Sequence, residues 1–530
     1  MCNVISSSRQ FNSVIDLMIR NSTEYPNKMA FEIDGRSLTY REFHDCVDIC
    51  ANSLLSLGVK RNDRVATMLF NCVEQTIIWF AAVRIGAIWV PFNVGLMRED
   101  LHHVLSDSKP TVLLIDPDNH EKFQDFAIED LPEFRFITGS DDFSGFRSFD
   151  FLKNDSERNL NNFSGSKSSP SVIIYTGGTT GMPKGVVLPN YAFVAAGERY
   201  AQAFEVHSND VHFSVLPLFH VGGSMIGFLG PFYCQIPTYI ERWFSVSKFW
   251  KRAIETNATV IDPIGTMVTL LAQSESSEGD GQALVRSSLG VFGQISDHVR
   301  EQYIKRFNLK IVGVYSLTEA GGTLIVHNKM NSKKPLSNGL PFGWCEIKIA
   351  DDLGDSVPLG VVGNILLRPT VPDTFMIEYY NAPIKTLECT RNLWLHTGDF
   401  GCLDEEGFLY FAGRQAHWIR CRGENVSAYE VESILSQHDF VQESAVVGVS
   451  SDLGEEDIKA FVILKEGTYV SPQDLIGWCA ERLAKFKIPR YIVYCADFPR
   501  SAAKREIERH KLKAGVFENV YDHRNKPLFK

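Results

Sequence analysis

Hydrophobic and polar positions between residues 36 and 94 change their period in a regular order. The segment 38–58 has apolar residues at helical spacing, and 64–70 is a short apolar run typical of a strand. A second helix is predicted over 72–86 and a second strand over 87–93, and further helix–strand pairs follow. Strands that alternate with helices of this length form βαβ units around a mostly parallel sheet, which binds ligands at the carboxyl ends of its strands.

The chain changes character after residue 412. Its strand and helix segments become shorter, and residues 485–513 carry nine basic residues against three acidic ones. With 530 residues the chain is also too long for a single hydrophobic core. We therefore expect an α/β fold with a large N-terminal domain of βαβ subdomains over residues 1–412. A small α+β C-terminal domain with one basic face is expected over residues 413–530.

Composition and charge exclude several kinds of partner. The net charge of −11 argues against general affinity for nucleic acid or for an anionic membrane. The most apolar stretch, residues 76–92, is interrupted by Arg84 and Pro91, so no integral membrane segment is predicted. The N-terminus lacks the pattern of a secretory signal, and the eleven cysteines include no CxxC pair. These features indicate a reduced, cytoplasmic protein.

A glycine- and threonine-rich stretch, YTGGTTGMPKGVVLPN at residues 175–190, carries the first chemical signal. Apolar runs flank it, so it is predicted to form the tip of a β-hairpin. Its glycines let backbone N–H groups approach a ligand closely, while three threonines and a lysine add hydroxyl donors and a positive charge. This combination predicts a cradle for phosphate oxygens, which we call the phosphate loop (residues 176–184), with a simple turn of small residues as the alternative. A Walker A loop is excluded, because a glycine and not a hydroxyl residue follows the lysine.

Four further stretches make the signal specific. They are LPLFH (216–220), VYSLTEAGG (314–322), LWLHTGDFGCLDEEGFLYFAGR (393–414) and IRCRGENVSAYEVES (419–433). Together with the phosphate loop, in this order and at these separations, they resemble the adenylate-forming superfamily of acyl-CoA synthetases, luciferases and peptide synthetases. The resemblance runs from about residue 10 to residue 513. Within the superfamily, HTGD…DEEGF, GENVS and AKFKIP are most similar to the ligases that attach coenzyme A to carnitine or crotonobetaine.

This resemblance implies an ATP-dependent acid–CoA ligase that works in two steps. The carboxylate of a small acid attacks the α-phosphate of ATP to give acyl-adenylate and pyrophosphate, and the thiol of coenzyme A then displaces AMP. The implied cofactors are ATP, Mg²⁺ and coenzyme A, and the C-terminal domain is expected to rotate about a hinge between the steps. A homodimer is compatible with the resemblance. Two alternatives stay open: an adenylate-forming enzyme with another acceptor, and a nucleotide-binding regulator that has lost adenylation.

The resemblance also assigns the nucleotide to the motif residues. Glu319 would bind the Mg²⁺ that bridges the phosphates, and Tyr315 and Thr318 would face adenine and the α-phosphate. Asp399 would accept hydrogen bonds from two ribose hydroxyls, with Arg414 adding a donor there. The β- and γ-phosphates would be held by residues of the phosphate loop, namely Thr176, Gly177, Gly178, Thr179, Thr180, Gly181 and Lys184.

The remaining implied roles concern catalysis and the thiol. Catalytic roles fall to four residues: Glu319, Thr180, His220 and Lys504. His220 would lie where the acid and the thiol meet, and Gly423 and Glu424 would form a wall of the pantetheine tunnel. The hinge position is commonly Asp or Lys in the family, whereas this chain has Ala416, which predicts a softer switch.

The C-terminus departs from the family pattern. In place of Pro-x-Thr-x-x-Gly-Lys, whose lysine serves adenylation, the chain has PRSAAKREIERHKLK, beginning at Pro499. Counting from Pro499 puts Arg505 at the lysine position, and counting back from HKLK puts Glu506 there. The nearest lysine is Lys504, which we nominate for the role.

The identity of the acid is not legible in the motifs. Its pocket is expected from four apolar or small segments: 220–228, 261–267, 290–296 and 315–322. A trimethylammonium acid such as carnitine would need an aromatic cage or a carboxylate beside its cation. The ring candidates are Phe219, Phe228 and Phe292, and Asp262 is the only acidic candidate before Glu319.

Overall fold

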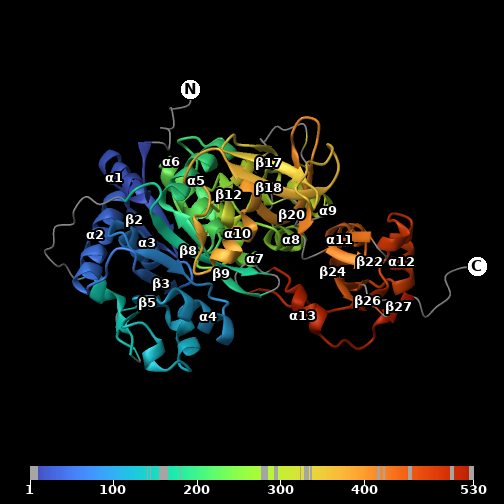
Figure 1. Cartoon of the computed structure of the whole chain (residues 1–530), viewed down its shortest axis with the longest axis horizontal. Helices are drawn as coiled ribbons and strands as arrows, with labels where there is room; N and C mark the ends of the chain where they lie inside the picture. The colour runs from blue at the N-terminus through green and yellow to red at the C-terminus, as the bar shows by residue number, and fades with distance from the viewer. Residues whose placement is uncertain are drawn as a thin grey trace, which may run out of the picture.

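The computed structural model contains a large N-terminal domain and a smaller C-terminal domain, which lie side by side in Figure 1. The described residues are 10–139, 141–143, 145–153, 165–178, 181–275, 285–291, 297–322, 324–327, 334, 337–414, 418–421, 424–451, 456–501 and 506–523. Within them no helix is both long enough and apolar enough to cross a membrane. The predicted α/β fold is confirmed, while the division at residue 412 stays a prediction.

An eight-stranded sheet, the first sheet, carries the predicted hairpin at one edge. Its order is β19-β9-β8-β4-β3-β5-β6-β7, parallel from β8 to β7, with β9 and β19 antiparallel to their neighbours. The strands predicted over 64–70 and 87–93 are β3 and β4. The strands are β3 (Arg64–Met68), β4 (Ile88–Pro91), β5 (Val112–Ile115), β6 (Phe134–Ile137), β7 (Arg147–Ser148), β8 (Pro170–Gly178), β9 (Gly181–Pro189) and β19 (Glu378–Tyr379).

A nine-stranded sheet, the second sheet, packs against the first through a layer of helices. Its order is β16-β15-β14-β13-β12-β10-β11-β1-β2, with parallel strands from β14 to β1 and antiparallel strands at both edges. The strands are β1 (Met29–Ile33), β2 (Arg36–Thr39), β10 (His212–Ser214), β11 (Thr238–Ile240), β12 (Val260–Ile261), β13 (Ser287–Val291), β14 (Ile311–Ser316), β15 (Leu324–His327) and β16 (Leu340–Pro341).

Helices fill the space between the two sheets and cover their outer faces. The helices predicted over 38–58 and 72–86 are α2 and α3, and α2 begins with a capping box formed by Thr39 and Glu42. The large domain contains α1 (Val14–Glu24), α2 (Tyr40–Ser56), α3 (Val73–Arg84), α4 (Arg98–Ser108), α5 (Asn190–Ala203), the π-helical segment η5 (Gly222–Leu229), α6 (Gly230–Cys234), α7 (Val246–Glu255), α8 (Thr266–Gln273), α9 (Asp297–Phe307) and α10 (Pro383–Cys389).

A continuous aromatic core joins the two sheets. Trp79 of α3 stacks on Trp89 of β4 at 4.7 Å between ring centroids, and Phe228 of η5 meets Phe31 of β1 edge-on at 5.2 Å. The same cluster contains buried side chains of α2 and α5, so these helices lie between the sheets. Helix α4 covers the outer face of the first sheet, while α7, α8 and α9 cover the outer face of the second. The two sheets therefore share one hydrophobic core.

A third, antiparallel sheet completes the large domain and carries the HTGD motif. Its last two strands form a hairpin that pairs Asp399 with Arg414. Asp404 closes the turn, because its Oδ1 accepts from the backbone N–H groups of Glu406 at 2.9 Å and Phe408 at 3.0 Å. The strands are β17 (Cys345–Ala350), β18 (Gly363–Pro369), β20 (Leu395–Leu403) and β21 (Leu409–Arg414).

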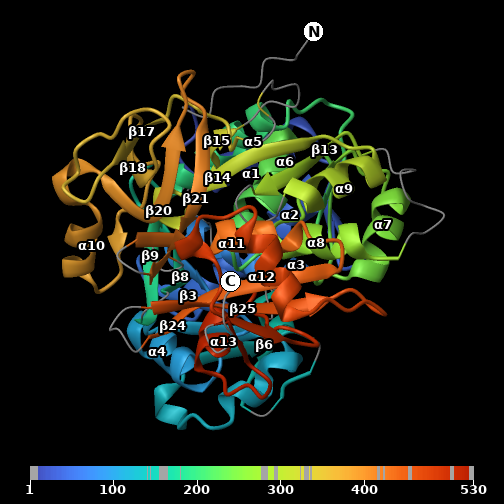
Figure 2. The same cartoon turned by 90° about the vertical axis from the view of Figure 1, so that its right-hand side faces the viewer.

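The C-terminal domain is a small α+β unit that lies in front of the large domain in the view of Figure 2. Strands β24 and β25 form a long antiparallel pair, and β26 adds in parallel to β25. Its elements are β22 (Trp418–Cys421), β23 (Glu424–Ser427), α11 (Ala428–Ser436), β24 (Val441–Ser450), β25 (Glu456–Leu464), α12 (Pro472–Ala480), β26 (Tyr491–Tyr494), α13 (Arg509–Ala514) and β27 (Tyr521–Asp522).

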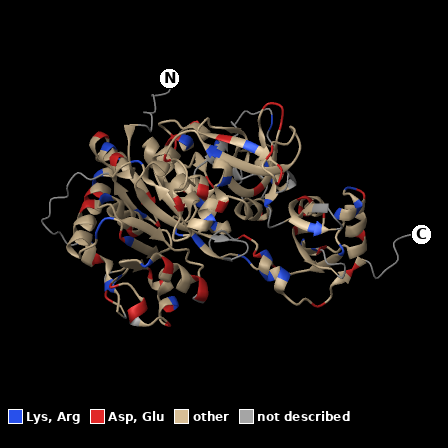
Figure 3. Cartoon of the chain, viewed as in Figure 1, with Lys and Arg blue, Asp and Glu red and all other residues tan. Residues whose placement is uncertain are grey.

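The basic face predicted for this domain is largely neutralised by ion pairs. Basic and acidic residues are interspersed over the domain (Figure 3). The excess of basic residues along 485–513 is local to the sequence, because most of the acidic partners come from residues 430–457. The pairs are Lys487 with Glu430, Arg490 with Asp457, Arg500 with Glu443, Arg509 with Glu432, Lys511 with Glu508 and Lys513 with Glu456.

A buried polar network packs against η5. Asp262 is fully buried, and its Oδ2 accepts from Ser214 Oγ at 2.7 Å and from His212 Nε2 at 3.3 Å. Because Nε2 is the donor, His212 Nδ1 is left to accept the Tyr200 hydroxyl at 2.8 Å. Gly227 of η5 packs directly on this network, since a Cβ there would lie 2.4 Å from Ser214 Oγ.

We predict that Gly227→Ala lowers the free energy of unfolding by about 1–3 kcal/mol, because the added methyl group overpacks a rigid polar core. Urea denaturation followed by circular dichroism measures the change. Gly222→Ala is the matched control in the same segment, because its Cβ would lie 3.3 Å from Leu216 Cδ1, the end of a flexible side chain. Equal stability of the two variants would contradict the packing argument.

Candidate active site

The phosphate loop forms the tip of the β8–β9 hairpin, as predicted. The register places Thr176 opposite Lys184, and Thr176 Oγ1 donates to the Lys184 carbonyl oxygen at 3.5 Å. Gly177, Gly178 and Gly181 lie on the two strands beside the tip. Two predicted phosphate ligands, Thr179 and Thr180, lie outside the described residues.

Helix α4 binds both strands of this hairpin beside its tip. The Tyr175 hydroxyl donates to Asp107 Oδ2 at 2.6 Å, and His103 Nε2 hydrogen-bonds the Pro183 carbonyl oxygen at 2.9 Å. Because the acceptor is a carbonyl, His103 Nε2 carries the proton. These contacts fix both strands of the hairpin next to the phosphate loop.

Glu319 lies on a 3₁₀ turn, η6 (Thr318–Ala320), directly after the carboxyl end of β14. Its Oε1 accepts from the Tyr379 hydroxyl at 2.8 Å, and Lys184 Nζ lies 4.5 Å from the centroid of the same tyrosine ring. The charges of Glu319 and Lys184 both affect the pKa of the Cys389 thiol. Burial and the Glu319 charge raise the pKa of this thiol to about 11, while Lys184 acts in the opposite direction. The structure thus brings the predicted phosphate cation and the predicted magnesium ligand together.

Asp399 forms the second half of the site. Its side chain is buried, its Oδ2 accepts from the Tyr315 hydroxyl at 2.7 Å, and its Oδ1 lies 3.4 Å from Arg414 Nε. Burial raises the pKa of Asp399, and the Glu319 charge adds to the rise, whereas Arg414 and Tyr315 lower it. Burial and the neighbouring Asp399 raise the pKa of the Tyr315 hydroxyl well above its usual value, so this group stays a donor.

The charge of Glu506, in the C-terminal domain, acts on Arg414. Partial desolvation lowers the pKa of Arg414, but the charges of Asp399 and Glu506 more than offset this effect. The backbone at Glu506 is fixed by a hydrogen bond, because its carbonyl oxygen accepts from the Ser501 backbone N–H at 2.8 Å. One of the two counts put Glu506 at the adenylation lysine, and the structure instead places its carboxylate near an arginine.

Several predicted residues fall where the structure gives no description. Lys504, Arg505, Gly423 and Ala416 lie outside the described residues, and for Glu424 only the backbone, on β23, is described. Their predicted roles in adenylation, in the hinge and in the pantetheine tunnel therefore stay predictions.

His220 adjoins residues 317–322 through its neighbours. It is half-buried and immediately precedes η5, and its carbonyl oxygen accepts from Ser224 Oγ at 2.9 Å. Gly322 packs against this segment, because a Cβ there would lie 2.4 Å from Val221 Cγ1 and 3.0 Å from Met225 Sδ. The backbone at Gly322 also has a positive φ of +63°, which favours glycine. Residues 317–322, which we call the Glu319 turn, are therefore in direct contact with the beginning of η5.

Comparison with known proteins decides what kind of enzyme this arrangement belongs to. Residues 19–380 match the AMP-binding enzyme family, and residues 430–505 match the AMP-binding enzyme C-terminal domain.

The chain belongs to the AMP-binding enzyme family.

Individual relatives agree with this assignment. The chain is 32% identical over 481 residues to a crotonobetaine/carnitine–CoA ligase of Escherichia coli, covering 89% of this chain and 92% of that protein. The o-succinylbenzoate CoA synthetase of Bacillus subtilis with its acyl-adenylate intermediate is 25% identical, with a TM-score of 0.78 over 94% of this chain and 98% of the other. The fold also matches the anthranilate CoA ligase AuaEII in complex with anthranoyl-AMP at 24% identity, with a TM-score of 0.87 over 96% of this chain and 98% of the other.

These findings confirm the predicted resemblance to adenylate-forming acyl-CoA ligases and support the acid–CoA ligase over its alternatives. CoA ligases of this family use ATP, Mg²⁺ and coenzyme A. The donor set fits these groups: Glu319 would supply a hard oxygen ligand for Mg²⁺, Lys184 a cation for phosphate, and Asp399 an acceptor for hydroxyl groups. A cytoplasmic location and a homodimer stay predictions.

The residues proposed to hold a cationic acid belong to the core of this AMP-binding enzyme. Phe228 is fully buried in the aromatic core between the sheets, and Phe219 is buried against the first sheet. Both oxygens of Asp262 are already acceptors, since the backbone N–H of Val215 adds a bond to Oδ1 at 3.4 Å. Phe292 lies outside the described residues. Spacing alone did not distinguish pocket residues from core residues here.

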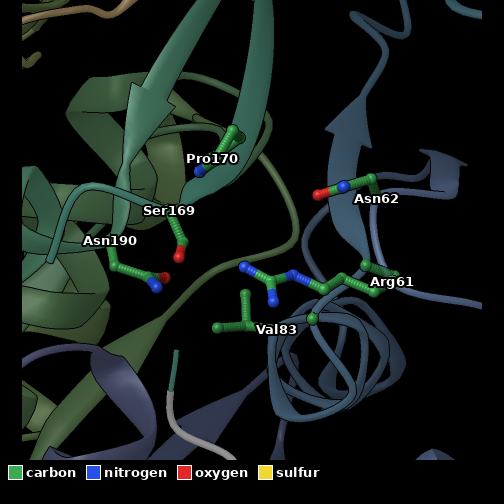
Figure 4. A pocket seen from close by; sticks show the side chains of 8 residues that line it. Arg61, Asn62, Val83, Ser169, Pro170 and Asn190 are labelled. Atoms are coloured by element: carbon green, nitrogen blue, oxygen red, sulfur yellow. The ribbon is translucent and has the colours of Figure 1, made fainter. Parts of the chain in front are cut away.

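A small depression elsewhere on the large domain is unconnected with this site. It lies at the amino ends of β3, β4 and β8 (Figure 4). The phosphate loop lies at the other, carboxyl end of β8. The residues around it include Arg61, Asn62, Val83, Ser169, Pro170 and Asn190. Ligands of open α/β sheets bind at the carboxyl ends of the strands, so the depression is on the wrong side for the nucleotide.

We predict that adenosine binding weakens as the pH is lowered, beginning at a higher pH than an ordinary aspartate would cause. The pKa of Asp399 is raised, so its carboxylate gains a proton early on the acidic side and then loses acceptor capacity for the ribose hydroxyls. Adenosine is the probe because it carries no phosphate that titrates. Calorimetric dissociation constants for the wild type and for Asp399→Asn measure the effect. A wild-type profile as flat as that of Asp399→Asn would contradict the role of Asp399.

Proposed function

We propose that this chain is an ATP-dependent acid–CoA ligase that converts a small carboxylic acid, ATP and coenzyme A into acyl-CoA, AMP and pyrophosphate. The convergence of Lys184, Glu319 and Asp399 carries the proposal. These residues come from the first sheet, the second sheet and the third sheet, and each matches one part of a magnesium nucleotide. A chain that only binds nucleotide would not need the AMP-binding enzyme C-terminal domain, which residues 430–505 match.

Adenylation asks mainly for positioning and charge stabilisation. The acid carboxylate attacks the α-phosphate and pyrophosphate leaves, so negative charge builds up on the phosphate oxygens. In this proposal Lys184 and Thr176 hold the β- and γ-phosphates, and Glu319 holds the Mg²⁺ that neutralises them. Asp399 and Arg414 fix the ribose.

The remaining assignments of the nucleotide and the acid belong to the same proposal. Tyr315, beside Asp399, would face adenine, and Thr318, beside Glu319, would face the α-phosphate. His220 would stand at the acid end, because Val221 beside it contacts Gly322 of the Glu319 turn.

Thiol transfer requires a different arrangement of the C-terminal domain, which we place at residues 413–530. The junction with residues 1–412 is close-packed: Phe400 and Trp418 have ring centroids 4.6 Å apart, and Ser427 Oγ donates to the Ala412 carbonyl oxygen at 3.0 Å. These contacts lie at the proposed hinge itself, so rotation about it preserves a pivot while moving β24 and α13. Gly423 and Glu424 would then form the pantetheine tunnel.

We further propose that the acid has an uncharged tail. A trimethylammonium group needs an aromatic cage or an available carboxylate, and Asp262, Phe219 and Phe228 are buried in other contacts. The side chains that pack against the Glu319 turn at Gly322, Val221 and Met225, are apolar. The substrate would therefore differ in charge from the acids that name the Escherichia coli relative.

A panel of acids tests the function and the acid class together. We expect acid-dependent ATP–pyrophosphate exchange, and formation of a thioester with coenzyme A, for uncharged short, long or aromatic acids. Carnitine and crotonobetaine are expected to give lower kcat/KM values, because a buried cation without a partner is costly. Exchange without thioester would indicate another acceptor, and nucleotide binding without exchange would indicate a regulator. Preference for the betaines would overturn the uncharged tail alone.

The adenylation cation is tested by separating the two half-reactions. Lys504→Ala is expected to slow acid-dependent ATP–pyrophosphate exchange by on the order of 100-fold or more, because a cation aimed at the α-phosphate is lost. Conversion of synthetic acyl-adenylate and coenzyme A to thioester should continue nearly unchanged, since rotation carries this residue away before the thiol enters. Arg505→Ala is the matched control, because guanidinium has a different, planar geometry. Loss of exchange only in Arg505→Ala would move the role one residue along.

A further inference from the structure

One tyrosine contacts both the phosphate cation and the magnesium ligand of the proposed site. The Tyr379 hydroxyl donates to Glu319 Oε1 at 2.8 Å, and Lys184 Nζ lies 4.5 Å from the centroid of its ring. Tyr379 was not among the residues predicted from the motifs. Its side chain is buried, with 5% of its surface exposed, so both contacts are shielded from water.

The backbone enforces this position from two sides. Strand β19 pairs with β9 so that Tyr379 stands opposite Val186, and the Tyr380 backbone N–H donates to the Gly185 carbonyl oxygen at 2.7 Å. On the other side, the Met376 backbone N–H donates to the Glu319 carbonyl oxygen at 2.9 Å. The segment is therefore fastened to the phosphate loop's own strand and to the Glu319 turn at once.

The tyrosine also keeps two opposite charges apart. Both Lys184 and Glu319 belong to the described part of the chain, and no salt bridge joins them there. Each instead has a separate interaction with Tyr379, the ammonium with the ring face and the carboxylate with the hydroxyl. A direct ion pair would neutralise both groups and would turn the ammonium away from phosphate and the carboxylate away from metal.

The hydroxyl is suited to this task. The Tyr379 phenol carries one O–H donor, and it points this donor at a carboxylate oxygen, which can only accept. The bond occupies Oε1 only, which leaves Oε2 as a metal ligand. A hydrogen-bonded carboxylate holds its orientation toward a metal better than a freely rotating one.

We propose that Tyr379 is a positioning residue that separates Lys184 from Glu319 and aims each at its own part of the magnesium nucleotide. This inference rests on the proposed function, because it takes the roles of Lys184 and Glu319 from it. The hydroxyl orients the carboxylate for Mg²⁺, and the ring holds the ammonium in place before the phosphates arrive.

Two substitutions separate the two tasks. Tyr379→Phe removes the hydroxyl and keeps the ring, whereas Tyr379→Leu removes both. The probe is α,β-methylene-ATP, a nucleotide whose α–β bond is not cleaved, and its dissociation constant is measured by calorimetry without metal and across a Mg²⁺ titration. Tyr380→Phe is the matched control, because it removes a neighbouring hydroxyl that has no hydrogen bond to Glu319 in the described structure.

For Tyr379→Phe we expect the half-saturating Mg²⁺ concentration to rise by about tenfold, with the metal-free dissociation constant within about twofold of wild type. For Tyr379→Leu the metal-free dissociation constant should rise as well, because Lys184 becomes free to pair with Glu319. Tyr380→Phe should leave both quantities unchanged. Retained melting temperature in Tyr379→Phe would show that the split is not a folding defect.

Two results would overturn the proposal. An unchanged Mg²⁺ requirement in Tyr379→Phe would show that the hydroxyl does not orient Glu319. Equal losses of metal-free and metal-dependent binding in the Phe and Leu variants would reduce Tyr379 to a packing role. Failure of the proposed function is a separate outcome, because absence of acid-dependent exchange in the wild type leaves the binding measurements with α,β-methylene-ATP interpretable.

Discussion

The negative charge of two carboxylates sets the conditions for the whole site. Glu319 and Asp399 come from different sheets; burial raises the pKa of Asp399, and the Glu319 charge adds to the rise. Two negative charges in one site are tolerated only when cations and donors surround them. Arg414 approaches one carboxylate, and a tyrosine hydroxyl donates to each. The protein therefore balances part of the negative charge of the two carboxylates. In the proposed function, the metal and the ribose hydroxyls of a magnesium nucleotide would balance the rest.

Much of the fold follows from local patterns. The helical period and the apolar runs between residues 36 and 94 correctly predict α2, β3, α3 and β4, because each element buries one clearly marked face or is buried on both. The phosphate loop is a hairpin tip, as its glycines and its flanking apolar runs indicate. The motif residues Lys184, Glu319 and Asp399 were also identified from the sequence. Their convergence was expected only from the family resemblance, because it depends on three sheets packing together and no local pattern shows it.

What the sequence did not reveal depends on contacts between distant segments. Tyr379 acquires its position from a two-residue strand, which no periodic pattern marks, and from pairing with β9. Asp262 reads as a pocket residue in the sequence, but Ser214 and His212 occupy its carboxylate in the core. The basic run in the C-terminal domain failed as a prediction of a cationic face for the same reason. Its partners lie elsewhere in the chain, so charge along the sequence was a poor measure of charge on the surface.

Gly322 ties the acid end of the site to the metal end. Its missing side chain lets the turn that carries Glu319 rest against Val221 and Met225. Any redesign that enlarges or shrinks Val221 or Met225 to admit a different acid would also shift the turn that carries Glu319, the proposed metal ligand. With the roles proposed for His220 and Glu319, acid specificity and turnover would therefore be mechanically coupled. A variant library aimed at new acids should vary η5 and the Glu319 turn as one unit, because single changes at either would be selected against for reasons unrelated to the acid.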